Sequence, residues 1–195
     1  MVVLKKIMLI LLAIIPIIVA WIFLVKVSGY ENKGMIYGAS FNTEYASYLG
    51  LDPRLSFVKI LDDWDFKYIR LSAQWDLIEK TKGRYDFKEL DWMMNESAKR
   101  NAKIVLAVGH KTPRWPECHF PSWIDASSHT SHQSDLLNFM TTVVMRYKNH
   151  PALEVWQVEN EPFLGFGTCP AISSAYLQDE VDLVNEVEAA VEAPP

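Results

Sequence analysis

Two carboxylates and an amide follow one apolar segment in the C-terminal third of the sequence. The segment 153–158 is followed directly by Glu159, Asn160, Glu161 and Pro162. A carboxyl group at the end of a strand is suited to general acid and base chemistry, because it can give up a proton and later take one back. Both carboxylates lie on the same strand, so they cannot act together from opposite sides of one bond. The segment therefore supplies one proton-transfer group.

The elements that position this group are predicted by alternating patterns from Gly34 onward. Short β-rich runs alternate with segments of helical periodicity, which favours βαβ units and a parallel sheet. The expected strands are residues 35–41, 68–72, 103–108 and 153–158. The expected helices are residues 53–64, 87–100, a segment from 134 to the stop signal at 149–151, and a last segment through 177–191. Asp86 and Glu89 predict a capping box in front of the second helix.

The connections between these elements indicate one type of α/β fold. The long connections follow the strands, whereas the returns from helix to strand are short. In (β/α)8 barrels the loops after the strands build the active site, and a complete barrel typically has about 250 residues. This sequence has 195 residues. We therefore predict the first half, about four βα units, of a TIM (β/α)8 barrel over residues 34–195.

The run Val155–Pro162 resembles clan A of the retaining glycoside hydrolases, the group that holds cellulase-like, xylanase-like and β-galactosidase-like barrels. In that clan an Asn-Glu-Pro at the end of the fourth strand carries the acid/base. The resemblance implies that Glu161 is the acid/base and that Asn160 contacts the 2-hydroxyl of the cleaved sugar. It also implies a β-linked oligosaccharide or polysaccharide as substrate and requires no cofactor.

Two further stretches carry the same resemblance. Tyr68-Ile69-Arg70-Leu71 and the residues up to Leu90-Asp91-Trp92 match the clan between its second strand and helix, and Gly109-His110 matches the end of its third strand. The resemblance implies that Arg70 braces the nucleophile and that His110 lines the substrate site. The sequence also offers 7 Trp and 8 Tyr, and sugar faces stack well on such rings. Trp75 and Trp115 are the candidate sugar platforms.

A retaining hydrolase needs a second carboxyl about 5 to 5.5 Å from the first. In the clan this nucleophile follows the seventh strand, and the sequence ends where the fifth strand is expected. Glu159 is rejected as the nucleophile because it shares a strand with Glu161. We therefore expect a fragment of a longer reading frame that is inactive alone. The alternative is a membrane-tethered glycan-binding or assembly module without turnover, and a third possibility is an unrelated barrel enzyme.

Each candidate also has a structural explanation. Glu161 would then be a solvated turn residue, Arg70 an ion-pair partner and His110 a hydrogen-bonded loop residue. The tryptophans would be packing residues. The sequence alone leaves these alternatives open.

The N-terminus predicts a membrane anchor. After Lys5 and Lys6, residues 7–25 contain no charged residue. As a helix, this segment is long enough to span a hydrocarbon core of about 30 Å. We expect residues 1–29 to form an uncleaved signal anchor, with the globular part outside the cytoplasm. A cleaved signal peptide is the alternative, because Val27-Ser28-Gly29 resembles a cleavage site.

The two cysteines and the charge balance complete the expectations. Cys118 and Cys169 are the only cysteines, and in an exported chain they are candidates for one disulfide. A zinc site is disfavoured, because the candidate ligands fit no usual spacing, and no metal is required. These candidate ligands are His110, Cys118, His119, His129 and His132. With 19 Lys and Arg against 24 Asp and Glu and no basic cluster, nothing favours a nucleic acid partner.

Overall fold

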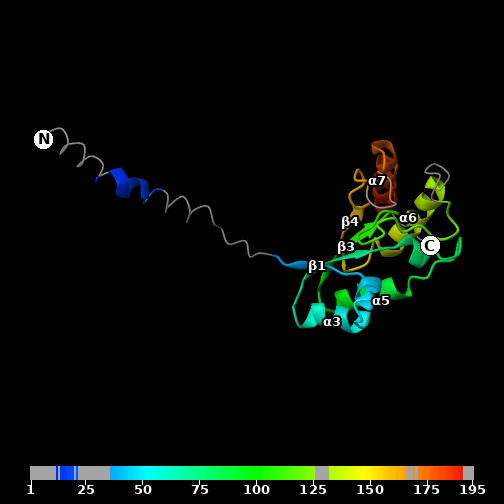
Figure 1. The fold of residues 1–195 in the computed structure, drawn as a ribbon, viewed down its shortest axis with the longest axis horizontal. Coiled ribbons are helices and arrows are strands. Elements are labelled where there is room, and N and C mark those ends of the chain that lie inside the picture. The colour runs from blue at the N-terminus through cyan, green and yellow to red at the C-terminus, as the bar shows by residue number, and fades with distance from the viewer. Residues whose placement is uncertain are drawn as a thin grey trace. The chain divides into compact units, whose positions relative to one another are not determined.

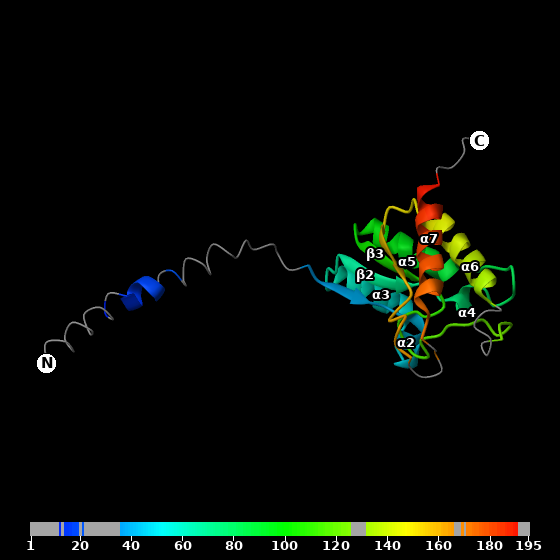
Figure 2. The same cartoon turned by 90° about the horizontal axis from the view of Figure 1, so that it is seen from above.

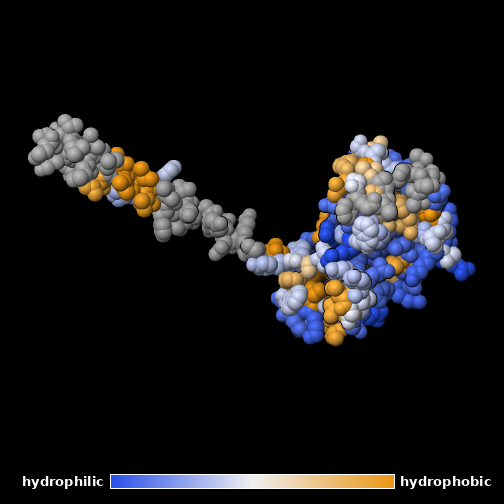
Figure 3. Space-filling model, viewed as in Figure 1, coloured by the Kyte–Doolittle hydropathy of each residue, from blue (hydrophilic) through white to orange (hydrophobic). Residues whose placement is uncertain are grey.

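The structure is a computed structural model that describes residues 12, 14–19, 21, 36–125, 132–165, 169 and 171–190. The chain divides into two compact units, Met1–Ile36 and Tyr37–Pro195. In the first unit residues 14–19 are helical and exposed, and Figure 3 shows the described residues there as mostly apolar. The predicted span 7–25 lies mostly outside the described residues. Within the described part of the chain, no helix is long and apolar enough to cross a membrane.

The second unit is built on four parallel strands in the order β1-β2-β3-β4 (Figure 1). The strands are β1 Gly38–Ser40, β2 Tyr68–Ser72, β3 Lys103–Val108 and β4 Leu153–Val158. The last three match the predicted ranges. The first is shorter than predicted, and residue 35 lies outside the described residues. Sequential parallel strands separated by helices form the first half of a (β/α)8 barrel, as the sequence predicts.

Helices follow each of the four strands. They are α2 Thr43–Tyr48, α3 Pro53–Asp62, α4 Trp75–Ile78, α5 Lys88–Lys99, α6 Gln133–Tyr147 and α7 Ser174–Ala189. The short helices α2 and α4 are additions to the predicted set. Asn42 starts α2 by accepting a hydrogen bond from the Tyr45 amide at 2.7 Å, a side-chain cap that stabilises even a short helix.

The predicted capping box at the start of α5 is wrong. The residue at the cap position is Phe87, which makes no side-chain cap hydrogen bond. Asp86 accepts a hydrogen bond from the Lys88 amide at 3.1 Å, but Glu89 turns away and pairs with Arg54 of α3 at 2.8 Å. A charged partner on the neighbouring helix therefore replaces the local backbone contact.

The sheet has one helix-covered face and one bare face. Alternate strand residues point to the helices and are buried, including Ile69 and Leu71 of β2 and Ile104 and Leu106 of β3. Figure 2 shows α6 and α7 side by side. These two helices contact each other, and α7 also contacts β4. The residues between the buried ones, such as Arg70, face the side without helices.

Candidate active site

An open polar cluster forms where β2 and β4 approach their carboxyl ends on the bare face. Arg70 of β2 donates from Nε to Ser40 Oγ at 2.9 Å and from Nη1 to Gln157 Oε1 at 3.3 Å. The same Nη1 lies 3.5 Å from Asn160 Oδ1. Arg70 thus connects residues of β1 and β4 across the sheet. We call Arg70, Gln157, Asn160 and Glu161 the open edge.

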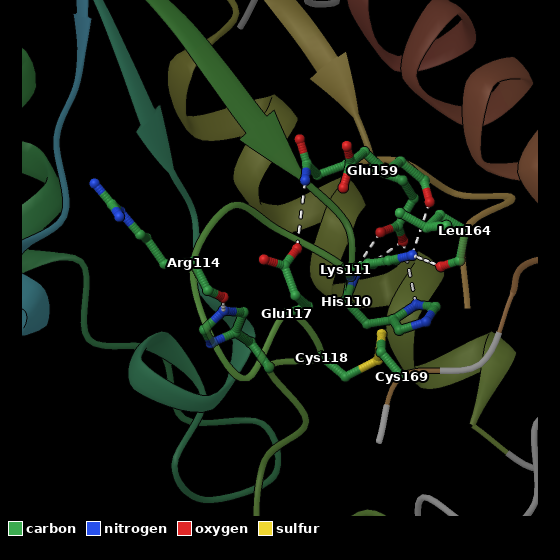
Figure 4. Close-up of a disulfide and its surroundings, with 11 residues drawn as sticks. His110, Lys111, Arg114, Glu117, Cys118, Glu159, Leu164 and Cys169 are labelled. Carbon is green, nitrogen blue, oxygen red and sulfur yellow. Dashed lines mark hydrogen bonds and ion pairs between the residues drawn. A yellow bond between two sulfur atoms is a disulfide. The ribbon is translucent and has the colours of Figure 1, made fainter. Parts of the chain in front are cut away.

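Asn160 links the open edge to the loop after β3. Its Nδ2 lies 3.4 Å from Glu117 Oε2, a contact drawn in Figure 4, and its backbone amide donates to the Lys111 carbonyl at 2.7 Å. No pattern in the sequence marks Glu117 as a site residue, because it follows no strand directly. The loop that carries it folds back so that Thr112 N donates to the Glu117 carbonyl at 2.9 Å.

Glu161 follows Asn160 as an exposed residue in the left-handed backbone region, with φ of 50°. This conformation is unfavourable for residues with a Cβ. Its carbonyl accepts hydrogen bonds from the Lys111 ammonium at 2.7 Å and from the Leu164 amide at 2.9 Å. The backbone is therefore fixed at Glu161, and the carboxyl group lies in solvent, where it is accessible to a bound molecule.

His110 lies in the loop after β3 and, unlike Glu161, is buried, with only 3% of its surface exposed. Its ring stacks on Phe120 at 4.7 Å, and Nδ1 lies 3.1 Å from Glu159 Oε1. Burial lowers the pKa of His110 to about 4, so the ring is neutral at neutral pH. The prediction that His110 lines the substrate site therefore needs correction, because a substrate cannot reach a ring enclosed in this way.

Glu159 is held in a backbone cradle at the end of β3. Its two carboxylate oxygens accept hydrogen bonds from the amides of His110 at 2.9 Å and Lys111 at 2.6 Å. Gly109, with φ of 130°, makes room for this contact, because a Cβ there would lie 2.3 Å from Glu159 Oε1. Glu159 thus faces away from the open edge although it is two residues from Glu161.

Glu180 of α7 lies beside Glu159 and is also fully buried. No donor among the described residues faces either Glu180 oxygen. Burial raises the pKa of both carboxyls. The Glu159 charge raises that of Glu180 further, whereas the two backbone amides and Lys111 lower that of Glu159. A proton carried by Glu180 and donated to Glu159 satisfies both groups. We call His110, Lys111, Glu159 and Glu180 the buried cluster.

The two tryptophan candidates lie in different environments. Trp75 is 0% exposed and stacks on Phe139 of α6 at 5.6 Å, so it is a core residue and cannot serve as a sugar platform. Trp115 is 66% exposed. It lines a hollow of about 370 Å³ together with Tyr45 and Tyr48, whose rings stack at 6.1 Å. The Arg114 guanidinium covers the Tyr45 ring at 4.2 Å.

The predicted cysteine pair, Cys118 and Cys169, forms a disulfide with a Cα–Cα distance of 5.3 Å (Figure 4). It joins the loop after β3 to the loop after β4, the two loops that also share the buried cluster. The covalent link therefore restrains the loop that carries Glu161.

The buried cluster also contains the side chains best placed for a metal ion among the described residues. His110, Glu159 and Glu180 each offer a ligand atom within 4.8 Å of the others. A divalent cation would add two positive charges beside the buried Lys111 ammonium, whereas one proton on Glu180 leaves the cluster neutral. The residues therefore fit a proton better than a metal. Of the zinc set considered from the sequence, Cys118 is in a disulfide and His129 lies outside the described residues.

Comparison with known proteins places this arrangement among carbohydrate-active barrels. The family model described as glycosyl hydrolase family 10 matches residues 63–176, which is more than half of the chain. A β-galactosidase from an Arthrobacter species is 24% identical over 148 residues, which cover 66% of this chain and 21% of that protein. The chain spans about a fifth of the length of the curated relatives it matches.

Solved structures share the fold. GH5_18 from Streptomyces cattleya in complex with GlcNAc aligns with a TM-score of 0.59 at 12% identity, over 77% of this chain and 40% of that one. The exo-β-1,4-mannosidase Op5Man5 from an Opitutaceae bacterium aligns with a TM-score of 0.57 at 15% identity, over 77% of this chain and 29% of that one. At these identities the alignments support the half-barrel architecture and leave the substrate open.

Proposed function

The chain belongs to glycosyl hydrolase family 10, and on this premise we propose that it supplies the acid/base side of an active site that hydrolyses O-glycosidic bonds in β-linked glycans. Glu161 is the acid/base of a retaining mechanism. The observation that supports this proposal is the open edge. There Arg70 and Asn160 lie 3.5 Å apart, directly before an exposed carboxyl at the end of β4.

The mechanism assigns two successive roles to Glu161. Its protonated carboxyl donates to the leaving glycosidic oxygen while a second carboxylate attacks the anomeric carbon and forms a glycosyl-enzyme. The resulting Glu161 carboxylate then takes a proton from a water molecule whose oxygen attacks the anomeric carbon. This attack breaks the glycosyl-enzyme bond, frees the nucleophile carboxylate and releases the sugar with retained configuration. Glu159 does not fit the nucleophile, because its side chain is 0% exposed and its oxygens are held by backbone amides. We assign the nucleophile to a barrel strand beyond β4.

The substrate is a β-linked oligosaccharide or polysaccharide in this proposal. Asn160 has an amide suited to a sugar hydroxyl, and Arg70 of β2 orients that amide from across β3. Trp115 and Tyr48 offer exposed ring area beside a hollow in the loops after β1 and β3. Sugar rings stack on such faces. The hollow is therefore the place where we expect a sugar unit remote from the cleaved bond.

We also propose that residues 7–25 anchor the protein in a membrane with the catalytic unit outside the cytoplasm. The apolar run supports this location. The Cys118–Cys169 disulfide supports it as well, because disulfides persist in oxidising compartments. Intact protein should stay in the membrane pellet after alkaline carbonate extraction, and release into the supernatant would contradict the anchor.

The test of function is leaving-group dependence in the intact protein. With Glu161→Gln, turnover of unactivated β-linked disaccharides should fall by about 10²- to 10⁴-fold, because the leaving oxygen loses its proton donor. Cleavage of 2,4-dinitrophenyl β-glycosides needs no such donor, so its first step should change little. Added azide should replace water in the second step and yield a β-glycosyl azide.

Glu154→Gln is the matched control, since Glu154 is an exposed carboxylate on β4 whose partner is Lys103 at 3.6 Å. It should leave both substrates unaffected. Equal rates for Glu161→Gln and the wild type on disaccharides would exclude the acid/base role. Wild-type protein that binds β-glycans in calorimetry but never turns them over would favour a glycan-binding module.

A further inference from the structure

Lys111 is a fully buried lysine, 0% exposed, in the loop after β3. Its ammonium donates to the Glu161 carbonyl at 2.7 Å and to the Leu164 carbonyl (Figure 4 labels Lys111 and Leu164). Both acceptors belong to the loop after β4. One side chain of the third βα unit therefore holds the backbone of the residue proposed to donate the proton.

The backbone at Glu161 needs such a partner. Its φ of 50° is a conformation that residues with a Cβ disfavour. The carbonyl of Glu161 is fixed by two donors, Lys111 Nζ and the Leu164 amide. A change in the position of this peptide unit would also move the Glu161 side chain, because the carbonyl carbon and the Cβ atom are bonded to the same Cα.

The buried cluster keeps Lys111 in place. A buried ammonium requires a nearby negative charge. Glu159 supplies it through space, since the Lys111 charge lowers the pKa of Glu159, and its carboxylate is fixed by the backbone amides of His110 and Lys111. Burial and the neighbouring Glu159 raise the pKa of the second carboxyl, Glu180, which favours its neutral form, so that it adds no further charge. The cluster is thus a neutral, fully enclosed support behind the open edge.

We propose that Lys111 is a positioning residue that fixes the orientation of Glu161 through the backbone carbonyls of the β4 loop. This inference rests on the proposed function of Glu161. It assigns to Lys111 no contact with substrate. Lys111 acts by keeping the acid/base carboxyl aligned with the leaving oxygen, and Glu159 acts one step further away by holding Lys111.

The test compares Lys111→Met with wild type on two substrates of different leaving-group ability. The methionine keeps the length of the side chain and removes the ammonium. Misalignment of the acid should lower kcat for unactivated disaccharides by about 10- to 100-fold with little change in KM. For 2,4-dinitrophenyl β-glycosides kcat/KM, which reports the first step, should fall less than about threefold, because their departure needs no proton. The ratio of the two rates is the readout.

Lys148→Met is the matched control. Lys148 also donates to two backbone carbonyls, those of Val187 at 3.2 Å and Ala190 at 2.6 Å, but these lie at the end of α7. Its loss should leave the rate ratio unchanged. A structural role for Lys111 would lower both rates equally, through the amount of folded protein, and that result would overturn the proposal. An unchanged rate ratio in Lys111→Met would overturn it as well.

Folding of the variant is controlled separately. If Lys111→Met fails to fold because Glu159 loses its counter-charge, the double variant Lys111→Met/Glu159→Gln removes both charges together. It should fold and show the same altered rate ratio. The Glu161→Gln result distinguishes the two hypotheses. If Glu161→Gln shows leaving-group dependence and the Lys111 variants do not, only the positioning role fails. If Glu161→Gln shows none, the proposed function fails.

Discussion

Glu159 and Glu161 lie two residues apart at the end of β4, yet they occupy opposite environments. Glu159 belongs to the buried cluster on the helix-covered side, where the backbone amides of His110 and Lys111 hold its carboxylate. Glu161 belongs to the open edge and is exposed. A regular strand would put residues two apart on the same side. Both residues instead have positive φ, 59° and 50°, and this turn after β4 brings the two carboxyls into different environments. The comparison shows how one short segment supplies both a structural carboxylate and a candidate reactive one.

The first prediction is the largest and compares the two carboxylates directly. Glu159→Ala should destabilise the protein by about 3–5 kcal/mol, because it leaves the Lys111 ammonium buried without a counter-charge. Glu161→Ala should change stability by less than about 0.5 kcal/mol, as expected for an exposed side chain. Urea unfolding of the two variants measures both values. Similar losses for the two would mean that the environments are not different.

The second prediction concerns the cradle of Glu159. Gly109→Ala should cost about 2–4 kcal/mol, since its Cβ would lie 2.3 Å from Glu159 Oε1 in addition to the unfavourable φ. Gly50→Ala is the control, because Gly50 also has positive φ, 74°, but nothing lies within 4 Å of an added Cβ. It should cost only about 1 kcal/mol. Equal costs would show that Glu159 moves aside freely.

The third prediction tests the proton in the buried cluster. A group whose pKa is raised by folding stabilises the folded state at low pH and loses that contribution as pH rises through the raised value. Glu180 is such a group, and it faces Glu159, His110 and Tyr176, with Asp179 nearby. The melting temperature should therefore fall between about pH 6.5 and pH 9, by an amount equivalent to on the order of 3 kcal/mol, since each pH unit over which only the folded state holds the proton costs about 1.4 kcal/mol.

Glu180→Gln mimics the protonated carboxyl and should flatten this slope, whereas Glu186→Gln, an exposed change on the same helix, should not. His110 has the opposite sign. Its pKa is lowered to about 4, so it destabilises the folded state as pH falls from about 6.5 toward 4. A wild-type melting temperature independent of pH above 6.5 would contradict the shared proton.

The fourth and smallest stability effect belongs to the open edge. Arg70→Met removes hydrogen bonds to Ser40, Gln157 and Asn160, all made by a partly exposed side chain. It should cost about 1 kcal/mol of stability. Its effect on β-glycan affinity in calorimetry should be larger, because Asn160 loses its orienting partner. A stability loss as large as that of Glu159→Ala would place Arg70 among the structural residues instead.

Local patterns in the sequence were sufficient for the elements and for one long-range link. The β-rich runs predicted the bounds of β2 and β3, and the apolar stripe predicted α6. Such patterns can be read from the sequence because they are properties of a short segment. The two cysteines, placed after neighbouring strands, were enough to indicate the disulfide.

The environment of loop residues could not be predicted in the same way. His110 and Trp75 both follow strands, where a site residue is expected, but Gly109 turns His110 toward the helices and α4 folds Trp75 onto Phe139. Lys111 has no local pattern that marks it as buried. A signal existed only for Gly109, since a glycine at a strand end often permits a close approach of another group.

The sequence by itself determined the order, type and bounds of most elements and the segment that carries Glu161, because hydrophobic period and turn residues act over a few positions. Only the tertiary structure decided which side of the β4 turn each polar group occupies. That choice depends on contacts between Lys111, Glu159 and Glu180, which lie far apart in the chain and meet only after α7 packs against the sheet. Burial and charge compensation are properties of that assembly, so they settle which carboxylate is held and which is accessible.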